Sequence, residues 1–102
     1  MERLIRDLSK SITDNLKDAQ MAYDWAKEAK SAGMTDMATY FISRAKTRLQ
    51  MLNEDHGKVV EIIKKLEAQG TPMPPGRYVA FHDYLIEQRD QLEFCITHFK
   101  PQ

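Results

Sequence analysis

Apolar residues recur at helical spacing from residue 34 to residue 66, in steps of three or four without a change of phase. This period is typical of an α-helix that buries one face. One member of the series, His56, is polar, and Gly57 falls on the opposite side. The series consists of Phe41, Ala45, Leu49, Leu52, His56, Val59, Ile63 and Leu66. The pattern predicts a helix over residues 35–69.

Two further features of this segment concern its buried face and its continuity. A second stripe of Met37, Tyr40, Met51 and Ile62 is expected to widen the face that packs. The polar run at residues 53–57 leaves open a break into two shorter helices. Because the apolar phase continues across that run, we expect one helix of about 50 Å, at 1.5 Å per residue.

Residues 2–31 carry a second helical pattern, whose apolar positions spread over two sides in the C-terminal half. The main stripe contains Leu4, Leu8, Ile12, Leu16, Ala19, Tyr23 and Ala26. Beside it lie Met21, Trp25, Ala29 and Ala32. A face this wide contacts two neighbours within the chain, or one neighbour and another subunit.

The short connection between these two segments carries signals for helix ends. Gly33 suits a left-handed C-terminal cap. Thr35 and Asp36 offer oxygens for an N-terminal cap, and Asp36 suits the positive end of the helix dipole. A connection of this length predicts that the two helices are antiparallel.

A third helix is predicted over residues 77–99, after the proline-rich segment 72–76. Its prolines give a stiff, extended connector, which either crosses the end of the bundle as a loop or binds an aromatic-lined groove. The expected inner face contains Tyr78, Phe81, Leu85, Gln88, Leu92, Cys95, Ile96 and Phe99. Val79, Ile86 and Phe94 lie off that face and are candidates for a contact outside the monomer.

These patterns predict an all-α fold: one domain, residues 1–102, formed by an antiparallel bundle of three long helices at about 2–31, 35–69 and 77–99. We expect self-association to complete the bundle, because a two-fold homodimer would supply the helices of a four-helix core. The expected interaction surface consists of Met21, Trp25, Val79, Ile86 and Phe94.

The composition argues against several classes of partner. Fifteen basic and fifteen acidic residues cancel, unlike the charge balance of domains that bind nucleic acid or anionic membranes. No apolar run approaches the roughly 20 residues that span a bilayer. One cysteine, Cys95, cannot form an internal disulfide, and we expect it in the core. A lone cysteine fits a reducing compartment, so we expect a cytoplasmic protein.

His56 is the polar member of an otherwise apolar helix face. In a three-helix bundle it falls level with about Ile12 in the first predicted helix and Gln88 in the third. A hydrogen bond between His56 and Gln88, joined by Ser11 or Asn15, would satisfy two buried polar groups. We favour this structural role over a catalytic or ligand role.

His56 and His82 are the candidate metal ligands. With Asp83 and Glu87, His82 would form a metal site on the surface, although the spacing from His82 to Glu87 is not that of a good helical pair. His98 is expected only to interact with the negative end of its helix dipole.

One stretch, from Asn15 to Met51, has a characteristic order of aromatic, alanine and glycine positions. It contains Trp25, Ala26, Ala29, Ala32, Gly33, Met34, Ala38, Phe41 and Ala45. In this order the stretch resembles the first helix pair of ferritin-like proteins, particularly the rubrerythrin branch. The resemblance covers about a third of the chain and implies the fold of a helical hairpin.

That family binds two metal ions through carboxylates and histidines in its core. The resemblance places the first-helix glutamate at Asn15 and the second-helix Glu-x-x-His at Arg48 and Met51, so all three ligands are replaced. An amide is a weak ligand and a guanidinium brings a permanent positive charge, so we do not carry over the di-iron activity. We expect Arg48 to pair with Asp18. The expected buried polar residues are Asn15, Arg48, His56 and Gln88.

Three functions are compatible with the sequence. The first is a non-enzymatic protein without a cofactor that acts by protein–protein interaction or self-association. The second is a divergent ferritin-like metal-binding or redox protein, with iron or zinc held by His56, Glu54, Asp55 or His82. The third is a phosphocarrier that is modified on His82. No glycine-rich phosphate loop, nucleophile elbow or metal-spaced cysteine pair favours an enzyme.

Overall fold

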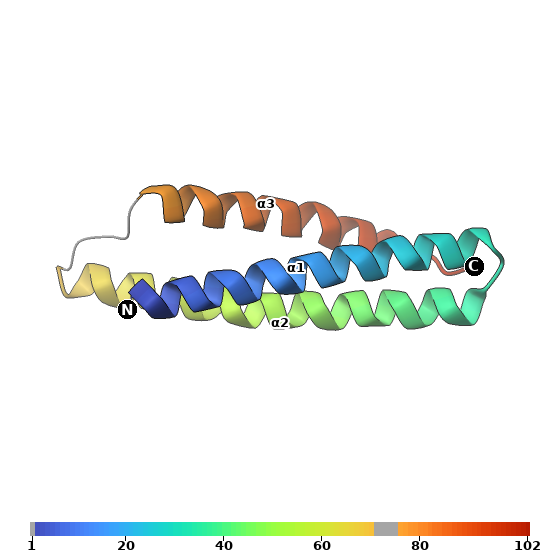
Figure 1. The fold of residues 1–102 in the computed structure, drawn as a ribbon, viewed down its shortest axis with the longest axis horizontal. Helices are drawn as coiled ribbons and strands as arrows, with labels where there is room; N and C mark the ends of the chain where they lie inside the picture. Colours follow the sequence, from blue (N-terminus) through green and yellow to red (C-terminus); the bar gives the residue numbers. More distant parts are fainter. Residues whose placement is uncertain (1, 71–75) are drawn as a thin grey trace.

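The computed structural model describes residues 2–70 and 76–102, with side chains over 3–70 and 82–102. It contains three helices, α1 (Glu2–Ser31), α2 (Thr35–Ala68) and α3 (Gly76–His98), and the described residues contain no strand. They form a rod of 56 × 19 × 18 Å (Figure 1). The predicted all-α bundle of three helices is confirmed, and each helix begins and ends within one residue of its expected bound.

The turn between α1 and α2 is closed by Gly33, whose φ of 75° lies in the left-handed region. Its N–H donates to the carbonyl of Lys30 at 3.0 Å, and the N–H of Met34 donates to Ala29 at 2.8 Å. This pair of bonds is a Schellman motif, as the glycine predicted. The expected N-cap was wrong, because Met34 occupies that position and makes no side-chain cap bond.

α2 returns alongside α1 in a regular register. Three contacts define it: Trp25 with Phe41, Asp18 with Arg48, and Ser11 with Asp55. The two residue numbers have the same sum in every pair, so positions equally far from the turn lie side by side along both helices.

The core lies along the α1–α2 interface, with α3 packed on one side of the helix pair. Five alanines with no exposed surface allow α1 and α2 to approach closely. They are Ala19, Ala22, Ala26, Ala38 and Ala45. Larger buried residues complete the core, namely Ile12, Ile42, Leu49, Leu52 and Val59 from the hairpin and Leu85, Leu92 and Ile96 from α3.

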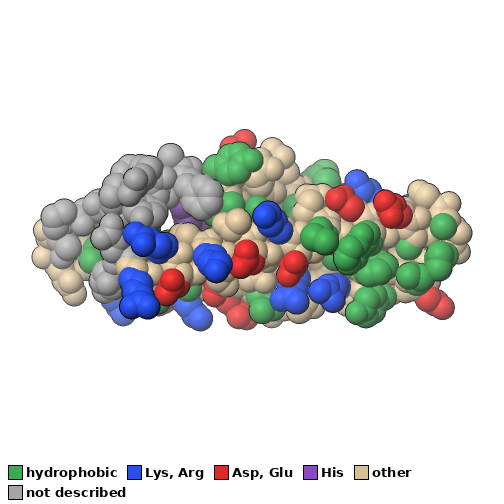
Figure 2. All heavy atoms as spheres, in the orientation of Figure 1, with side chains coloured by type: hydrophobic (Ala, Val, Ile, Leu, Met, Phe, Trp, Pro, Cys, Tyr) green, Lys and Arg blue, Asp and Glu red, His purple; other side chains and the backbone are tan. Residues whose placement is uncertain are grey.

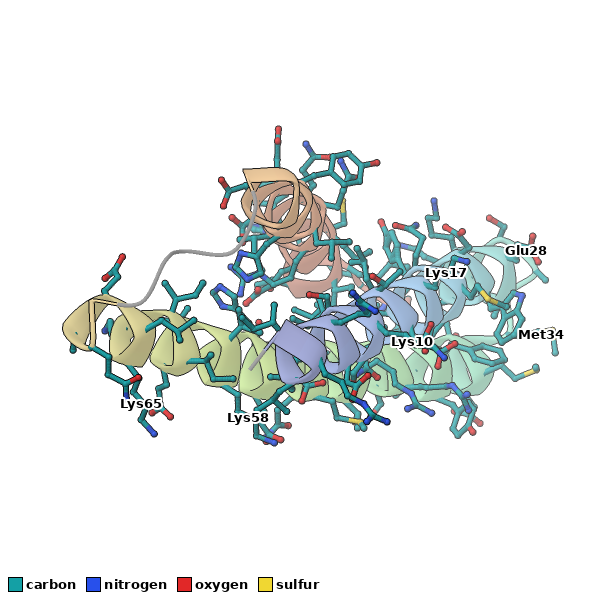
Figure 3. All side chains as sticks on the ribbon, turned by 60° about the vertical axis from the view of Figure 1, so that its left-hand side comes forward. Lys10, Lys17, Glu28, Met34, Lys58 and Lys65 are labelled. Carbon is teal, nitrogen blue, oxygen red and sulfur yellow. The ribbon has the colours of Figure 1, made fainter. Side chains whose placement is uncertain are left out.

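α2 runs without a break through residues 53–57, as the apolar phase predicted. Gly57 is exposed and has open space around it. The solvent-facing side of α2 carries lysines such as Lys58 and Lys65, which point away from α3 (Figure 3). A continuous α2 gives α1 a partner along its whole length.

The second stripe of α2 does not widen the core. Ile62 is buried, but Met37, Tyr40 and Met51 are exposed. Those three residues lie toward the side of α2 that α3 does not cover. Ile42, which belongs to neither stripe, is buried in the core instead. An apolar stripe that is left open in this way becomes a candidate for an intermolecular contact.

Over its described side chains, α3 packs on the hairpin through a different set of residues than its apolar pattern predicted. The ring of Phe99 meets that of Tyr23 edge-on at 5.9 Å, and Ile86 packs against the core rather than facing a partner. Cys95, expected in the core, is exposed. Tyr78, Val79 and Phe81 have side chains outside the described residues. No helix in the described chain is long and apolar enough to cross a membrane.

Candidate functional site

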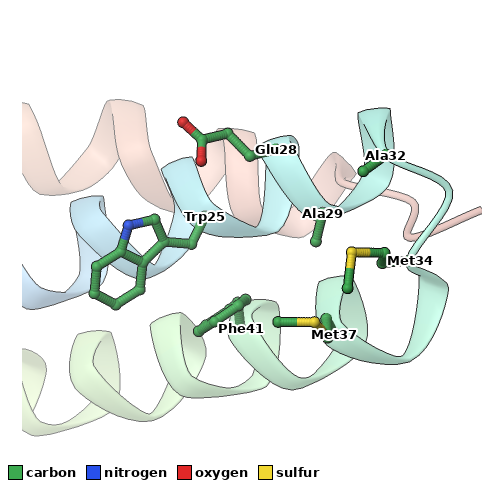
Figure 4. A pocket seen from close by; sticks show the side chains of 7 residues that line it. All are labelled: Trp25, Glu28, Ala29, Ala32, Met34, Met37 and Phe41. Atoms are coloured by element: carbon green, nitrogen blue, oxygen red, sulfur yellow. The ribbon is translucent and has the colours of Figure 1, made fainter.

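An open apolar surface lies between α1 and α2 near their turn. A hollow of about 450 Å³ is lined there by Trp25, Glu28, Ala29, Ala32, Met34, Met37 and Phe41 (Figure 4). We call it the apolar groove. Figure 2 shows hydrophobic side chains gathered over this end of the hairpin, whereas charged side chains dominate the other half of the same face.

Trp25 is the principal side chain of the apolar groove. Its indole remains 42% exposed and packs against Phe41 at a ring-centroid distance of 5.4 Å. Phe41 in turn meets Tyr40 at 5.3 Å, so three aromatic rings follow one another from α1 onto α2. Met21, one turn before Trp25, is exposed as well. The predicted exposure of Met21 and Trp25 is therefore confirmed.

A second, polar hollow of about 420 Å³ lies farther from the turn, again between α1 and α2. We call it the polar groove. Its lining residues are Asp7, Lys10, Ser11, Asp14, Asn15, Asp18, Arg48 and Met51. No described residue of α3 lines either groove, because α3 and Phe99 just after it contact other residues of the hairpin, such as Asn53 and Tyr23.

The three positions at which the sequence resemblance would place metal ligands, Asn15, Arg48 and Met51, all line the polar groove. Asn15 is only 6% exposed, while Arg48 and Met51 close the groove from α2. Arg48 Nε lies 3.8 Å from Asp18 Oδ2, so the predicted pair is confirmed. Arg48 is only half-buried, unlike Asn15. A guanidinium in this groove disfavours a cation at the same place.

The second site joins α2 to α3. The imidazole rings of His56 and His82 stack at a centroid distance of 4.8 Å and an interplanar angle of 24°. The predicted hydrogen bond between His56 and Gln88 was wrong, because the stack with His82 takes the place of Gln88, which is half-buried. Ser11 was also misplaced in that prediction, since it donates to Asp55.

The surroundings of the histidine stack favour neutral imidazoles. Burial lowers the pKa of both His56 and His82, and for His56 the neighbouring His82 and the guanidinium of Arg89 lower the pKa further. Among the described atoms, His82 Nε2 is buried without a hydrogen-bond partner. Arg89 is held nearby through a 2.7 Å bond to Asn53.

The arrangement of the histidines bears on the metal hypothesis. His82 lies 3.9 Å from Asp83, but its own side chain is only 16% exposed. The predicted metal site at His82, Asp83 and Glu87 was therefore wrong in placing His82 on the surface. The two stacked rings lie in nearly parallel planes, so their nitrogens do not point toward one shared ion. The described residues contain no group of three or more histidine, cysteine or acidic side chains that could hold a metal.

The end of α3 carries the last predicted surface residue. Phe94 is 65% exposed, as expected, and its ring lies 4.2 Å from that of His98. His98 Nδ1 is hydrogen-bonded to the carbonyl of Phe94 at 2.8 Å, in the last turn of α3. Both residues lie away from the apolar groove, whose described lining comes only from the hairpin.

Comparisons with protein-family models, with curated proteins and with solved structures find no significant match to this chain. Function must therefore be inferred from its own surfaces. Sequence reasoning identified Trp25 but not the α2 side of the apolar groove, where Met34, Met37 and Phe41 lie. Phe41 of the main stripe and Met37 of the second stripe were the signal, but both stripes were assigned to the buried face of the second helix.

Proposed function

We propose that this chain is a non-enzymatic, ferritin-like helical protein of the cytoplasm that acts by binding another protein surface through the apolar groove. The observation that carries the proposal is the half-exposed Trp25 in a hollow whose other described lining is apolar except for Glu28. Tryptophan and methionine are enriched at the centres of protein interfaces. The lone Cys95, exposed and reduced, supports the cytoplasmic location.

The shape of the groove suits a helical partner. Both helices of the hairpin contribute to its lining, with Trp25 and Ala29 on α1 and Met37 and Phe41 on α2 (Figure 4). An amphipathic helix or helix pair binds an apolar groove between two helices with its own apolar face. Met34 and Met37 have flexible side chains that adapt to the shape of what binds them.

A site-specific photo-crosslinker tests this function. Placed at Met37 in the apolar groove, the crosslinker should capture a protein in cells, whereas the same group at Tyr84, exposed on α3, should not. Adding Trp25→Ala should reduce capture from position 37 by roughly tenfold, the effect of about 1.4 kcal/mol. Equal capture from both positions, or none from position 37, would refute the proposal.

Metal binding is the second candidate, and one observation favours it. His56 and His82, far apart in sequence, have ring centroids only 4.8 Å apart. Iron or zinc binding would require the rings to rotate and a further ligand to approach. Zinc titration of the wild type and of His82→Ala tests this candidate, because only a site that uses the stack loses affinity in the variant.

A further inference from the structure

We infer that the partner in the apolar groove is a second copy of this chain, related by a two-fold axis that runs parallel to α1 and α2. This inference rests on the proposed function and specifies its partner. It follows from the register of the hairpin and from the order of apolar and charged positions along it.

The register makes the hairpin face complementary to itself. Trp25 lies level with Phe41, and Asp18 lies level with Arg48. A two-fold axis parallel to the helices places α1 of one copy over α2 of the other at the same level. Trp25 then faces Phe41 of the second copy, and Asp18 faces Arg48 of the second copy.

Charge complementarity supports this axis. Asp18 and Arg48 are partly exposed within one chain, with side-chain exposures of 44% and 32%, so both are accessible to a second pair. Two such pairs, related by the axis, form an alternating square of two carboxylates and two guanidinium groups. Opposite charges that are brought together at an interface favour the correct partner and register.

An axis perpendicular to the helices fits less well. Full overlap about such an axis sets the apolar groove of one copy on the polar groove of the other, where Asp14, Lys10 and Asp18 would lose water without matching partners. If the two copies overlap only at their apolar ends, their polar grooves make no contact with the second copy. The parallel axis instead sets the apolar groove of one copy against that of the other and places Asp18 opposite Arg48 of the second copy.

The position of α3 leaves room for this dimer. α3 contacts Asn53 and His56 of the hairpin, Phe99 just after it contacts Tyr23, and the described residues of α3 do not line either groove. Two hairpins that meet through their grooves form a four-helix core in which neighbouring helices are antiparallel. The net charge of each chain is zero, so no overall repulsion opposes the contact.

A charge-reversal mixing experiment tests the contact across the axis. Asp18→Arg gives four positive groups in the square, and Arg48→Asp gives four negative groups, so each variant alone should dimerise at least about tenfold more weakly than wild type. An equimolar mixture should restore dimers with one copy of each variant. Loss of association without recovery on mixing, or no loss in either variant, would overturn the inference. Circular dichroism confirms that each variant is folded.

The matched control uses a charged pair outside both grooves. Asp24 and Lys27 lie 3.5 Å apart within α1, and neither residue lines the apolar or the polar groove. Asp24→Arg and Lys27→Asp should leave the dimerisation constant within about twofold of wild type, alone or mixed. A similar loss in the control variants would show that net charge, rather than this contact, controls association.

Spin labels test the direction of the axis without altering the charge square. Lys17 (Figure 3), Gln20 and Ser31 are exposed along α1 and line neither groove, and each can be replaced by Cys in a Cys95→Ser background. About a parallel axis, the distance between equivalent labels is nearly the same at all three positions. About a perpendicular axis, it changes by about 3 Å per residue, twice the helical rise. A strong dependence on position would overturn the inference.

The crosslinking experiment separates failure of this inference from failure of the proposed function. Adducts from Met37 to a peptide of the same chain support the second copy. Adducts only to a different protein would leave the proposed function intact and overturn the dimer. A chain that stays monomeric up to millimolar concentration in sedimentation would also overturn the dimer.

Discussion

His56 in α2 stacks on His82 in α3 at 4.8 Å, and this contact between two neutral rings ties the third helix to the hairpin. Because burial lowers the pKa of both rings, they remain neutral in the fold at pH values where free histidines take up protons. Two charged imidazoles in this position would repel each other and Arg89. We therefore expect acid to weaken the attachment of α3 to the hairpin.

Acid should destabilise the fold through this stack. A pKa lowered from 6.5 means that the unfolded chain binds more protons than the folded chain as the pH falls past 6.5. The stabilisation is thus present above pH 6.5 and is lost as the pH falls through the folded pKa values. Thermal unfolding measured between pH 8 and pH 5 should show a falling Tm.

Two variants isolate the stack from other acid effects. His82→Phe keeps a ring against His56 and removes one titrating group, so Tm should depend less on pH than in the wild type. His98→Gln changes a histidine at the exposed end of α3 and serves as the control. The explanation fails if the slopes of Tm against pH are the same in the wild type and in His82→Phe.

The buried face of α2 is tested by Leu49→Ala. Leu49 is buried in the main core, so the cavity left by the variant should lower the free energy of unfolding by roughly 2–5 kcal/mol. Leu4→Ala is the matched control, since Leu4 is exposed and its loss should cost about 0.5 kcal/mol or less. Urea unfolding measures both. A small effect at Leu49 would place the core elsewhere.

Helical periodicity located the helices because it depends only on local sequence. The turn at Gly33 and the unbroken course of α2 follow from the same local signals. The pairing of Asp18 with Arg48 was also predictable, because a short turn fixes which positions of two antiparallel helices lie level.

The position of α3 was not predictable in this way. Counting along the bundle placed Gln88 beside His56, whereas His82 lies there, six residues or about 9 Å earlier in the helix. That shift depends on the path of the chain between α2 and α3, which periodicity does not determine. The exposed Met37 and the exposed Cys95 were misassigned for a related reason: a wide apolar face does not specify which side the third helix covers.

Trp25→Ala should weaken self-association with little effect on folding. Trp25 is half-exposed in the monomer but central to the apolar groove, so truncation should raise the dissociation constant by about tenfold or more. Phe94→Ala removes a more exposed aromatic ring from α3 and should leave the mass in solution unchanged. Sedimentation velocity measures both. If Trp25→Ala only lowers Tm, without a change in mass, Trp25 is a core residue instead.

Emission from Trp25 reports coverage of the groove directly, because it is the only tryptophan in the chain. Burial of the indole by a second copy should shift its emission to shorter wavelength as the protein concentration rises. Acrylamide quenching should decrease over the same range. Arg48→Asp should move both transitions to higher concentration, and emission that is independent of concentration would contradict coverage of Trp25 by a second copy.

Elemental analysis of protein purified without chelator or a metal-affinity tag tests the role of the polar groove. Arg48 places a guanidinium beside Asn15 and Met51, where the resemblance puts metal ligands, so we expect no stoichiometric iron, manganese or zinc. Arg48→Glu removes that cation and supplies a carboxylate beside Asp18, so it should raise zinc affinity at this groove. If the wild type binds stoichiometric metal and His82→Ala does not, protein binding is not the only function of the chain. That result would favour His56 and His82 as a pair of metal ligands.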